Sequence, residues 1–388
     1  MSKKPLPSVT VTLEKIVGGG QALGTMSDGR KLFVWGGLPS ETVEVQLTKK
    51  KSSYAEGVVM SIITPSKERV APRDPGSYLS TSPWQIMDFA AEQRHKAALI
   101  TEAFALHNVV LPNTTDIYSD GREYHYRNKV EFSWYSDATA GGDTLDLAFF
   151  RRGSKGKIIV DSCALLPEPL MQTARAIRDM LAGAAISARQ LKTLLIRCDQ
   201  AGNCVWQLYV THRDFDITTL RRETLGNGEV IYSNPQSPAS VITERLASFG
   251  SPVLSDSVLG VPFRYATEGF FQVNLPVYEQ ALRDMQQWVP PHKQTVDLYS
   301  GVGSIGLTIG GEGTTLVELN EHAVREMKRN IDQLGLNATA VLAASEHALD
   351  DITGDKTIIV DPPRAGLHEN VINRLLETRP QRILYLSC

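Results

Sequence analysis

The stretch that most constrains the fold is residues 292–306, HKQTVDLYSGVGSIG, where a short apolar run leads into glycines at positions 301, 303 and 306. Glycine at this spacing permits a tight turn and a close approach of the backbone to a ligand. We expect a buried strand, the turn, and then a helix whose first N–H groups and positive dipole end face a nucleotide-type cofactor. Glycine-rich turns of this kind also occur without a ligand, so the pattern alone does not decide the function.

Three short apolar stretches follow, and each leads into a residue suited to a ligand site. TTLVE ends in Glu318, where a carboxylate can accept both hydroxyls of a ribose. TIIVDPPR reaches Asp361, and RILYLSC reaches Cys388. Ligands bind at the carboxyl ends of the strands in open α/β sheets, so these three residues should meet Gly301 in one crevice.

Four motifs in this chain resemble those of the S-adenosylmethionine-dependent RNA 5-methyluridine methyltransferases that carry an N-terminal TRAM domain. The matching stretches are FFQVN at 270–274, DLYSGVG at 297–303, DPPRAG at 361–366 and YLSC at 385–388. The resemblance extends over nearly the whole chain. It implies S-adenosylmethionine as cofactor, RNA as partner, and a class I methyltransferase domain with a Rossmann-like sheet at residues 256–388.

The resemblance also implies which residues would bind the cofactor. They are Gln272, Tyr299, Ser304, Glu318, Glu346 and Asp361. Gln272 has an alternative role as part of a helix cap, because the apparent helix PVYEQALRDMQQWV follows it. Relatives often carry Asn at the position of Ser304. Near the adenine, Ser345 is an alternative to Glu346, since the alignment there is loose.

The resemblance assigns catalysis to Cys388 as a nucleophile. C5 of uracil is a poor nucleophile until a thiolate adds to C6, which converts the ring to an enolate whose C5 can attack the methyl group. Asp361 would orient the base or the cofactor, and Arg364 would stabilise the enolate charge. The target nucleotide would be flipped out of its stack to present its ring. A lone cysteine at a strand end is usually inert, so this role depends on the accompanying DPPR motif.

Two other functions stay open on the sequence. A non-catalytic RNA-binding relative would keep the fold without turnover. A nicotinamide oxidoreductase would also use the glycine turn, but it would leave DPPR and Cys388 without a role. Relatives continue past the nucleophile with an Asn-Pro step, two strands and a glutamate that removes the C5 proton, whereas this sequence stops at Cys388. We therefore expect a truncated copy that traps the methylated adduct, because elimination of the cysteine needs a base.

In residues 1–64, apolar and polar positions alternate in short runs separated by turn residues, as is typical of short strands. The runs VTVTLEKIV, KLFVWG, TVEVQLTKK and YAEGVVMSII predict a small β-barrel. The resemblance makes it a TRAM-like, OB-like RNA-binding barrel. Lys49, Lys50 and Lys51 beside Tyr54 suit contacts with RNA phosphates. The alternative is an ordinary solvated hairpin tip.

Residues 65–255 predict a linker helix followed by a central, mostly β domain for RNA recognition. Four cations flank aromatic residues on its expected strands and are candidates for RNA contacts: Arg127, Lys129, Arg151 and Arg152. The alternative is that they are cationic tips of an ordinary sheet. Cys198 and Cys204 flank a hairpin turn, and we expect two plain side chains lying close together rather than a metal site.

Many relatives hold a 4Fe–4S cluster with three cysteines just before the position of Trp84 and a fourth further on. In this chain the equivalent stretch, DPGSYLSTSP at 74–83, has no cysteine. Only Cys163 matches the fourth ligand. Because thiolates hold such clusters, we expect no iron–sulfur cluster and no other metal.

Length and composition limit the class of protein and the cellular compartment to be expected. With 388 residues, 42% of them hydrophobic, and a net charge of −3, we expect a soluble monomer of two or three domains. No apolar run is long enough to span a bilayer, and no secretory signal follows the N-terminal lysines. Four scattered cysteines do not form a disulfide framework, which favours the cytoplasm. The TRAM-like barrel favours ribosomal over transfer RNA, and the slightly acidic balance leaves RNA binding to local patches.

Overall fold

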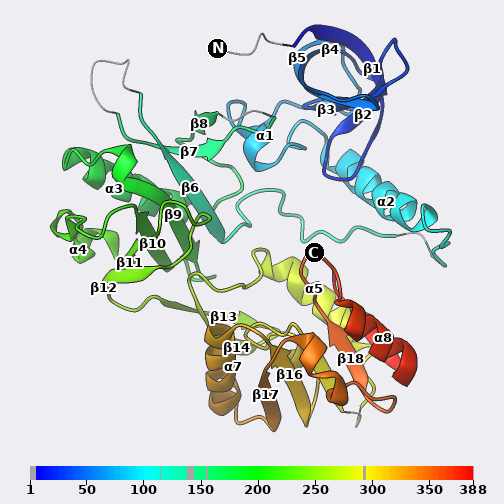
Figure 1. The fold of residues 1–388 in the computed structure, drawn as a ribbon, viewed down its shortest axis with the longest axis vertical. Helices are drawn as coiled ribbons and strands as arrows, with labels where there is room; N and C mark the ends of the chain where they lie inside the picture. Colours follow the sequence, from blue (N-terminus) through cyan, green and yellow to red (C-terminus); the bar gives the residue numbers. More distant parts are fainter. Residues whose placement is uncertain (1–5, 114, 138–143, 154–155, 292–293, 388) are drawn as a thin grey trace. The chain divides into compact units, whose positions relative to one another are not determined.

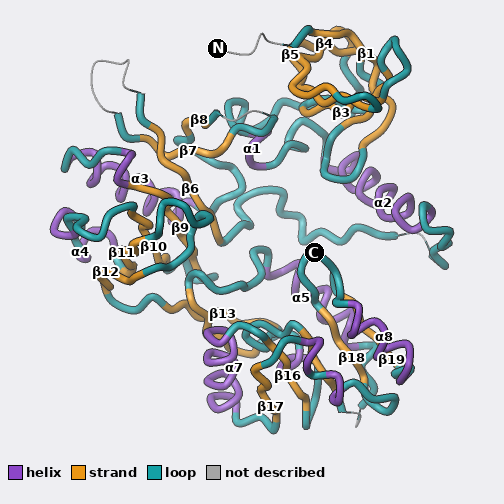
Figure 2. Tube along the Cα trace, in the orientation of Figure 1, coloured by secondary structure: helices purple, strands orange, loops and turns teal. Residues whose placement is uncertain are grey.

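The computed structural model describes residues 6–113, 115–137, 144–153, 156–291 and 294–387. The chain divides into two compact units. Unit 1 comprises Met1–Tyr126 and Phe132–Lys192, and unit 2 comprises Arg127–Glu131 and Thr193–Cys388. Figure 1 shows the elements in sequence colours, and Figure 2 shows how helices and strands alternate.

Unit 1 begins with a closed five-stranded barrel in the order β1-β2-β3-β5-β4, visible as a ring in Figure 1. Its strands are β1 (Ser8–Ile16), β2 (Ala22–Thr25), β3 (Lys31–Trp35), β4 (Thr42–Lys50) and β5 (Tyr54–Thr64). In β4, Val43, Val45 and Leu47 are buried while the residues between them are half-exposed. Alternate side chains of a strand point to opposite faces, so this pattern fills the barrel interior. The expected N-terminal β-barrel is confirmed.

The rest of unit 1 contains helices and a short antiparallel set of strands. The elements are α1 (Tyr78–Thr81), α2 (Phe89–Ala105), β6 (Lys129–Tyr135), β7 (Asp146–Phe150), β8 (Lys157–Ile159) and α3 (Glu168–Gly183). The first three residues of β6 belong to unit 2. Helix α2 begins at Phe89 because the Asp88 side chain accepts the N–H of Ala91, which caps the helix. Strand β7 pairs antiparallel with both β6 and β8.

Unit 2 continues the β-rich middle of the chain. Its elements are β9 (Leu191–Cys198), β10 (Cys204–Val210), α4 (Arg222–Leu225), β11 (Asn227–Tyr232), β12 (Glu244–Phe249), β13 (Val253–Val258) and β14 (Val261–Ala266). Strand β11 lies parallel to β10 and antiparallel to β12, while β13 and β14 form a separate hairpin. The expected mostly β middle segment is confirmed.

A disulfide joins Cys198 at the end of β9 to Cys204 at the start of β10. The expectation of two unbonded side chains is therefore wrong. The turn between them closes with a hydrogen bond from the Asp199 N–H to the Asn203 carbonyl, which places the cysteines opposite each other with Cα atoms 4.0 Å apart. Spacing in the sequence does not reveal this pairing, because it depends on how the turn sets the register of the two strands.

The C-terminal part of unit 2 is a parallel five-stranded sheet in the order β17-β16-β15-β18-β19. Its elements, with the helix that precedes it, are α5 (Leu275–Gln286), β15 (Thr295–Leu298), α6 (Gly306–Ile309), β16 (Thr314–Glu318), α7 (Glu321–Leu334), β17 (Ala338–Leu342), β18 (Thr357–Val360), α8 (Glu369–Thr378) and β19 (Arg382–Tyr385). The strand order reverses between β15 and β18, which is where open α/β sheets bind ligands. The expected Rossmann-like domain is confirmed.

Apolar side chains cover both faces of this sheet. On one face, Leu316 and Ile359 pack with Leu282 of α5 and Met327 of α7. On the other face, residues of β15 and β18 pack with Val371 and Leu375 of α8: Val296, Leu298, Ile358 and Val360. Asp297 lies between Val296 and Leu298 and so points to the α5–α7 face, which places a carboxylate in an apolar layer.

Among the described residues, no helix combines the length and the apolar character required to cross a bilayer.

Candidate functional site

The turn after β15 adopts the backbone conformations that its glycines permit. Gly301 has φ +57° and Gly303 has φ +87°. Tyr299 also has a positive φ, of 62°, which is uncommon for a residue with a side chain and aims its ring into the pocket described below. A Cβ atom at Gly306 would lie 2.6 Å from Leu316 and 2.9 Å from the Asp297 carboxylate, so only glycine fits there.

The helix that follows this turn is shorter than the sequence indicates. Helix α6 contains only Gly306–Ile309, and its first N–H is donated to Asp297 Oδ2 at 2.8 Å. A single turn carries little dipole, and the leading N–H is already used within the protein. The expectation of a helix N-terminus facing the cofactor is therefore corrected to a glycine turn that presents backbone and Tyr299.

Glu318 ends β16 and connects two neighbouring strand ends. One of its oxygens accepts the N–H of Gly301 at 3.0 Å, and the other accepts the N–H of Asn320 at 2.7 Å. Each carboxylate oxygen has further lone pairs, so the group can still accept hydroxyl donors. The two backbone contacts fix the carboxylate at the edge of the pocket.

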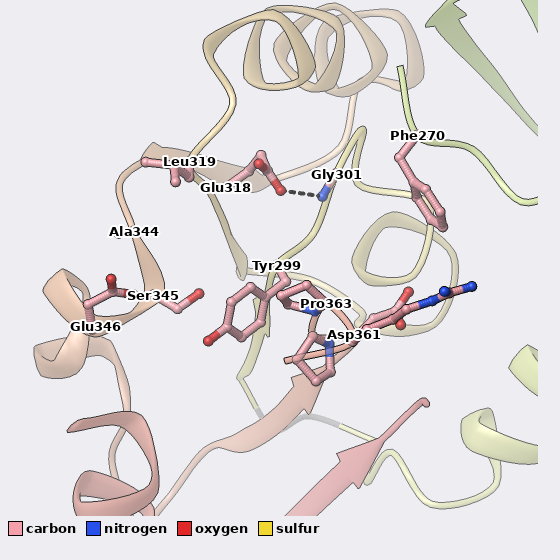
Figure 3. Close-up of a pocket in the computed structure, with 12 residues that line it drawn as sticks. Phe270, Tyr299, Gly301, Glu318, Leu319, Ala344, Ser345, Glu346, Asp361 and Pro363 are labelled. Carbon is pink, nitrogen blue, oxygen red and sulfur yellow. Dashed lines mark hydrogen bonds between the residues drawn. The ribbon is translucent and has the colours of Figure 1, made fainter. Parts of the chain in front are cut away.

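A pocket of about 520 Å³ opens at the carboxyl ends of β15, β16 and β18 (Figure 3). It is lined by Phe270, Tyr299, Gly301, Glu318, Leu319, Ala344, Ser345, Glu346, Asp361, Pro362, Pro363 and Arg364. In Figure 3, Glu318, Leu319 and the 344–346 segment lie at one end, Phe270 and Asp361 lie toward the other, and Tyr299 lies between them. Its length and mixed lining suit an elongated ligand with a nucleoside part.

The structure brings together four of the six side chains proposed for cofactor binding. Tyr299, Glu318, Glu346 and Asp361 all line the pocket. Ser304 does not; its hydroxyl lies 2.8 Å from the Tyr278 hydroxyl on α5. Gln272 lies before α5, and its carbonyl accepts the side-chain N–H of Asn128 at 3.1 Å. Cys388 lies outside the described residues.

Two apolar residues that the sequence analysis did not single out also line the pocket. Phe270 is 68% exposed and Leu319 is 69% exposed. A large apolar side chain that stays exposed beside a pocket is available to cover a ligand. Their positions in the sequence could have indicated this role. Phe270 is the first residue of the FFQVN motif, and Leu319 directly follows Glu318 at the end of its strand.

Burial raises the pKa of two carboxyl groups around the turn. The pKa of Asp297 rises to about 8 because the group is fully buried; the Gly306 N–H opposes the rise, and nearby Asp361 and Glu318 add to it. Oδ1 of Asp297 has no hydrogen-bond partner among the described atoms. Burial also raises the pKa of Asp361 to about 6. At neutral pH Asp361 is charged and favours a cationic group in the pocket that it lines, whereas Asp297 is protonated.

The basic residues proposed for RNA contacts differ in their surroundings. Lys50 and Lys51 are exposed at the tip between β4 and β5. Lys49 instead pairs with Glu56 at 2.6 Å and lies over the Tyr54 ring. This tip therefore offers two cations, with the third compensated by a carboxylate.

The four cationic residues of the middle segment also differ in their exposure and contacts. Arg152 packs over the Trp35 ring at 4.5 Å and donates to the Leu79 carbonyl, both within unit 1. Burial lowers the pKa of Lys129 to about 8. Arg151 and Arg127 are exposed. Arg151 and Arg127 thus remain the more accessible candidates for phosphate contacts.

A carboxylate holds the stretch DPGSYLSTSP at 74–83, where the sequence analysis looked for cluster ligands. Asp74 is 6% exposed, and both of its oxygens accept the N–H of Ala164, at 2.9 and 3.1 Å. Its Oδ2 also accepts from Gln85 at 2.9 Å. Cys163 lies next to Ala164 and is buried. One cysteine beside a carboxylate does not fit a 4Fe–4S cluster, which requires four cysteine ligands.

Comparisons with known proteins fit this architecture. A family model described as "Conserved hypothetical protein 95" matches residues 278–383. A structure of the tRNA (uracil-54, C5)-methyltransferase of Pyrococcus abyssi, in complex with S-adenosyl-L-homocysteine, superposes with a TM-score of 0.76 and 17% identity. The match covers 97% of this chain and 89% of that protein. This chain has the fold of that methyltransferase.

Relatives in sequence carry the same kind of name. An "Uncharacterized RNA methyltransferase" of Nitratidesulfovibrio vulgaris is 25% identical over 98% of this chain and 87% of its own length. The "23S rRNA (uracil(1939)-C(5))-methyltransferase RlmD" of Shewanella halifaxensis is 26% identical over 93% of this chain and 82% of its own length. The methyltransferase fold therefore occurs here in a chain whose relatives are named as RNA methyltransferases.

Proposed function

We propose that this protein is an RNA methyltransferase that transfers a methyl group from S-adenosylmethionine to C5 of a uridine. The observation that carries the proposal is the pocket, where Glu318, Tyr299 and Asp361 converge at three strand ends. A nicotinamide oxidoreductase would leave the Asp361-Pro-Pro-Arg364 wall of the pocket without a role.

The residues of the pocket fit this cofactor. Glu318, fixed by Gly301 and Asn320, would accept the ribose hydroxyls, and Leu319 and Glu346 would flank the adenine. The half-buried Asp361 carboxylate at the other end favours the positive charges of the methionine part. When bound, S-adenosylmethionine supplies an electrophilic methyl group on a sulfonium sulfur.

The chain's own residues would prepare the uridine. Strand β19 lies beside β18, and the Leu386 N–H is donated to the Val360 carbonyl at 2.9 Å. Cys388 follows Leu386 by two residues in the sequence and would supply the nucleophile. The Cys388 thiolate would form a bond to C6, and C5 would then take the methyl group. Arg364 would balance the charge that develops on the ring oxygen. Release of the product would then require a base that takes the C5 proton, so that the bond between sulfur and C6 breaks; without such a base the methylated adduct would persist.

We propose ribosomal RNA as the substrate. The relative named for a 23S rRNA uridine is 26% identical, compared with 17% for the structure named for a tRNA uridine. The domains would be a TRAM-like RNA-binding barrel at 1–64, a linker helix and RNA-recognition segment at 65–255, and the catalytic domain at 256–388. We expect the protein to act as a monomer in the cytoplasm.

The test is methyl transfer in vitro with a matched variant. The protein is incubated with labelled S-adenosylmethionine and either 23S ribosomal RNA or transfer RNA, both from cells lacking the gene. Nuclease digestion and mass spectrometry then detect 5-methyluridine. We expect it in ribosomal RNA with the native protein and at a much lower level with Glu318→Ala. RNA binding without methylation would instead support a non-catalytic RNA-binding protein.

A further inference from the structure

The loop from residue 267 to residue 274 joins β14 to α5 and carries one wall of the pocket. Two adjacent phenylalanines in it differ in their surroundings. Phe271 is 2% exposed and stacks on Tyr265 with ring centroids 4.1 Å apart. Phe270 is 68% exposed and lines the pocket (Figure 3). The loop itself has no helix or strand to hold Phe270 in this place.

Arg197 holds the backbone on both sides of Phe270. Its Nη1 donates to the Gly269 carbonyl at 2.8 Å, and its Nη2 donates to the Phe271 carbonyl at 3.2 Å. The side chain is 1% exposed and comes from β9, about seventy residues earlier in the chain. A planar guanidinium can make two such bonds at once with fixed geometry, which an ammonium group does not.

Asn128 extends this support to the next two residues of the loop. Its side chain donates to the Gln272 carbonyl at 3.1 Å, and its backbone N–H donates to the Val273 carbonyl at 3.2 Å. The Asn128 carbonyl in turn accepts the N–H of Cys198, the residue after Arg197. Arg197 near the end of β9 and Asn128, just before β6, thus support the loop together.

The contacts of Arg197 indicate a role in geometry rather than in charge pairing. Among the described residues no carboxylate lies within ion-pair distance of it, and its Nε has no hydrogen-bond partner. Asp256 and Glu268 interact with it only electrostatically, and it lies 5.3 Å from the centroid of the Tyr265 ring. Burial lowers its pKa to about 10. Burying a guanidinium costs free energy, and an apolar residue of similar size often replaces a buried charge without loss of stability. Packing alone therefore does not explain why an arginine occupies this buried position.

We propose that Arg197 is a positioning residue that fixes the Phe270 ring as a wall of the pocket. This inference rests on the proposed function only for its kinetic consequence, because the position of Phe270 can be measured without turnover. Arg197 lies behind the loop and lines no part of the pocket, so it would act on a ligand only through Phe270.

The direct test is fluorine NMR of protein labelled with 4-fluorophenylalanine. The Phe270 resonance is assigned by its absence in Phe270→Leu. In Arg197→Met we expect this resonance to move toward the shift of a free phenylalanine. The Phe271 resonance should move less, because its ring stays stacked on Tyr265 although its carbonyl also loses the Arg197 donor. Arg374→Met is the control, since Arg374 also donates to a backbone carbonyl, that of Leu349, but lies outside the pocket lining. A Phe270 resonance unchanged in Arg197→Met overturns the proposal.

A double-mutant cycle supplies the second test. We expect Arg197→Met and Phe270→Ala each to lower kcat/KM for RNA by about tenfold, and the double variant to be no worse than either one. Losses that multiply in the double variant would show that Arg197 acts independently of Phe270 and would overturn the proposal. If Arg197→Met does not fold, Arg197→Lys takes its place, since it retains the charge and loses the paired contact. A native protein without methyl transfer would refute the proposed function, and the NMR test would still decide the positioning role.

Discussion

The carboxylate of Glu318 accepts the backbone N–H of Gly301 at 3.0 Å, so the acid that ends β16 is tied to the glycine turn that follows β15. Two strand ends that are neighbours in the sheet thus share one carboxylate. The contact holds the acid at the edge of the pocket, and it makes the turn and the acid one structural unit.

Replacing Glu318 with Ala should weaken binding of S-adenosylhomocysteine by roughly 2–3 kcal/mol, because hydrogen bonds between ribose hydroxyls and a carboxylate are charge-assisted. Calorimetric titration measures this change. Glu321→Ala is the control, since Glu321 is an exposed acid in the first turn of α7. Equal affinity of Glu318→Ala and the native protein would remove Glu318 from the site.

The buried Asp297 should make stability depend on pH. Its pKa is raised to about 8 in the folded protein, compared with about 4 in an unfolded chain, so the folded state holds the proton over this range. Stability contributed by this group is complete at low pH and is lost as pH rises toward 8. Asn takes up no proton, so Asp297→Asn should lose less unfolding free energy between pH 6 and pH 8 than the native protein.

Urea titrations at several pH values test this prediction. Asp332→Asn, at an exposed position of α7, serves as the control and should follow the native curve. If Asp297→Asn and the native protein show the same pH dependence, the proton on Asp297 does not contribute to it.

Sequence reasoning succeeded where structure is local and failed where partners are distant. The run TTLVE became β16 with Glu318 at its end, because burial and period fix a short strand and its last residue. The partner of Ser304 is Tyr278, 26 residues away, and no local pattern indicates which helix residue packs on the turn. The sequence does not distinguish exposed Phe270 from buried Phe271, because their difference depends on the stacking of Phe271 on Tyr265.

Protonation of Asp361 should lower the rate of methyl transfer at acidic pH, which would appear as an acidic limb in the pH–rate profile. Burial raises its pKa to about 6, so the carboxylate loses its charge as pH falls through this value. If the charged form orients the base or the cofactor, log kcat/KM should fall below about pH 6 in the native protein. The residual activity of Asp361→Asn should lack this limb, because the amide does not titrate in this range. A limb that persists in the variant would assign the titration to another group.

Asp74 should be important for the stability of unit 1. It accepts from the Ala164 backbone and the Gln85 side chain at a buried position. Replacing it with Ala leaves both donors without this acceptor, which should cost roughly 3 kcal/mol of unfolding free energy. Asp116→Ala, at an exposed position, should change it little. Denaturant unfolding measures both, and equal stability of the two variants would contradict the structural role of Asp74.

The last prediction concerns the tip between β4 and β5, where the three lysines are not equivalent. Each phosphate contact contributes roughly 0.7 to 0.9 to the slope of log affinity against log salt concentration. Lys50 and Lys51 are exposed, so the Lys50→Ala/Lys51→Ala variant should lower that slope by about 1.5. Lys49 is already paired with Glu56, so Lys49→Ala should lower it by less. Fluorescence anisotropy with labelled ribosomal RNA fragments at several salt concentrations provides the slopes. If the double variant keeps the native affinity and slope, the tip does not contact RNA, and the exposed cations Arg127 and Arg151 become the next candidates.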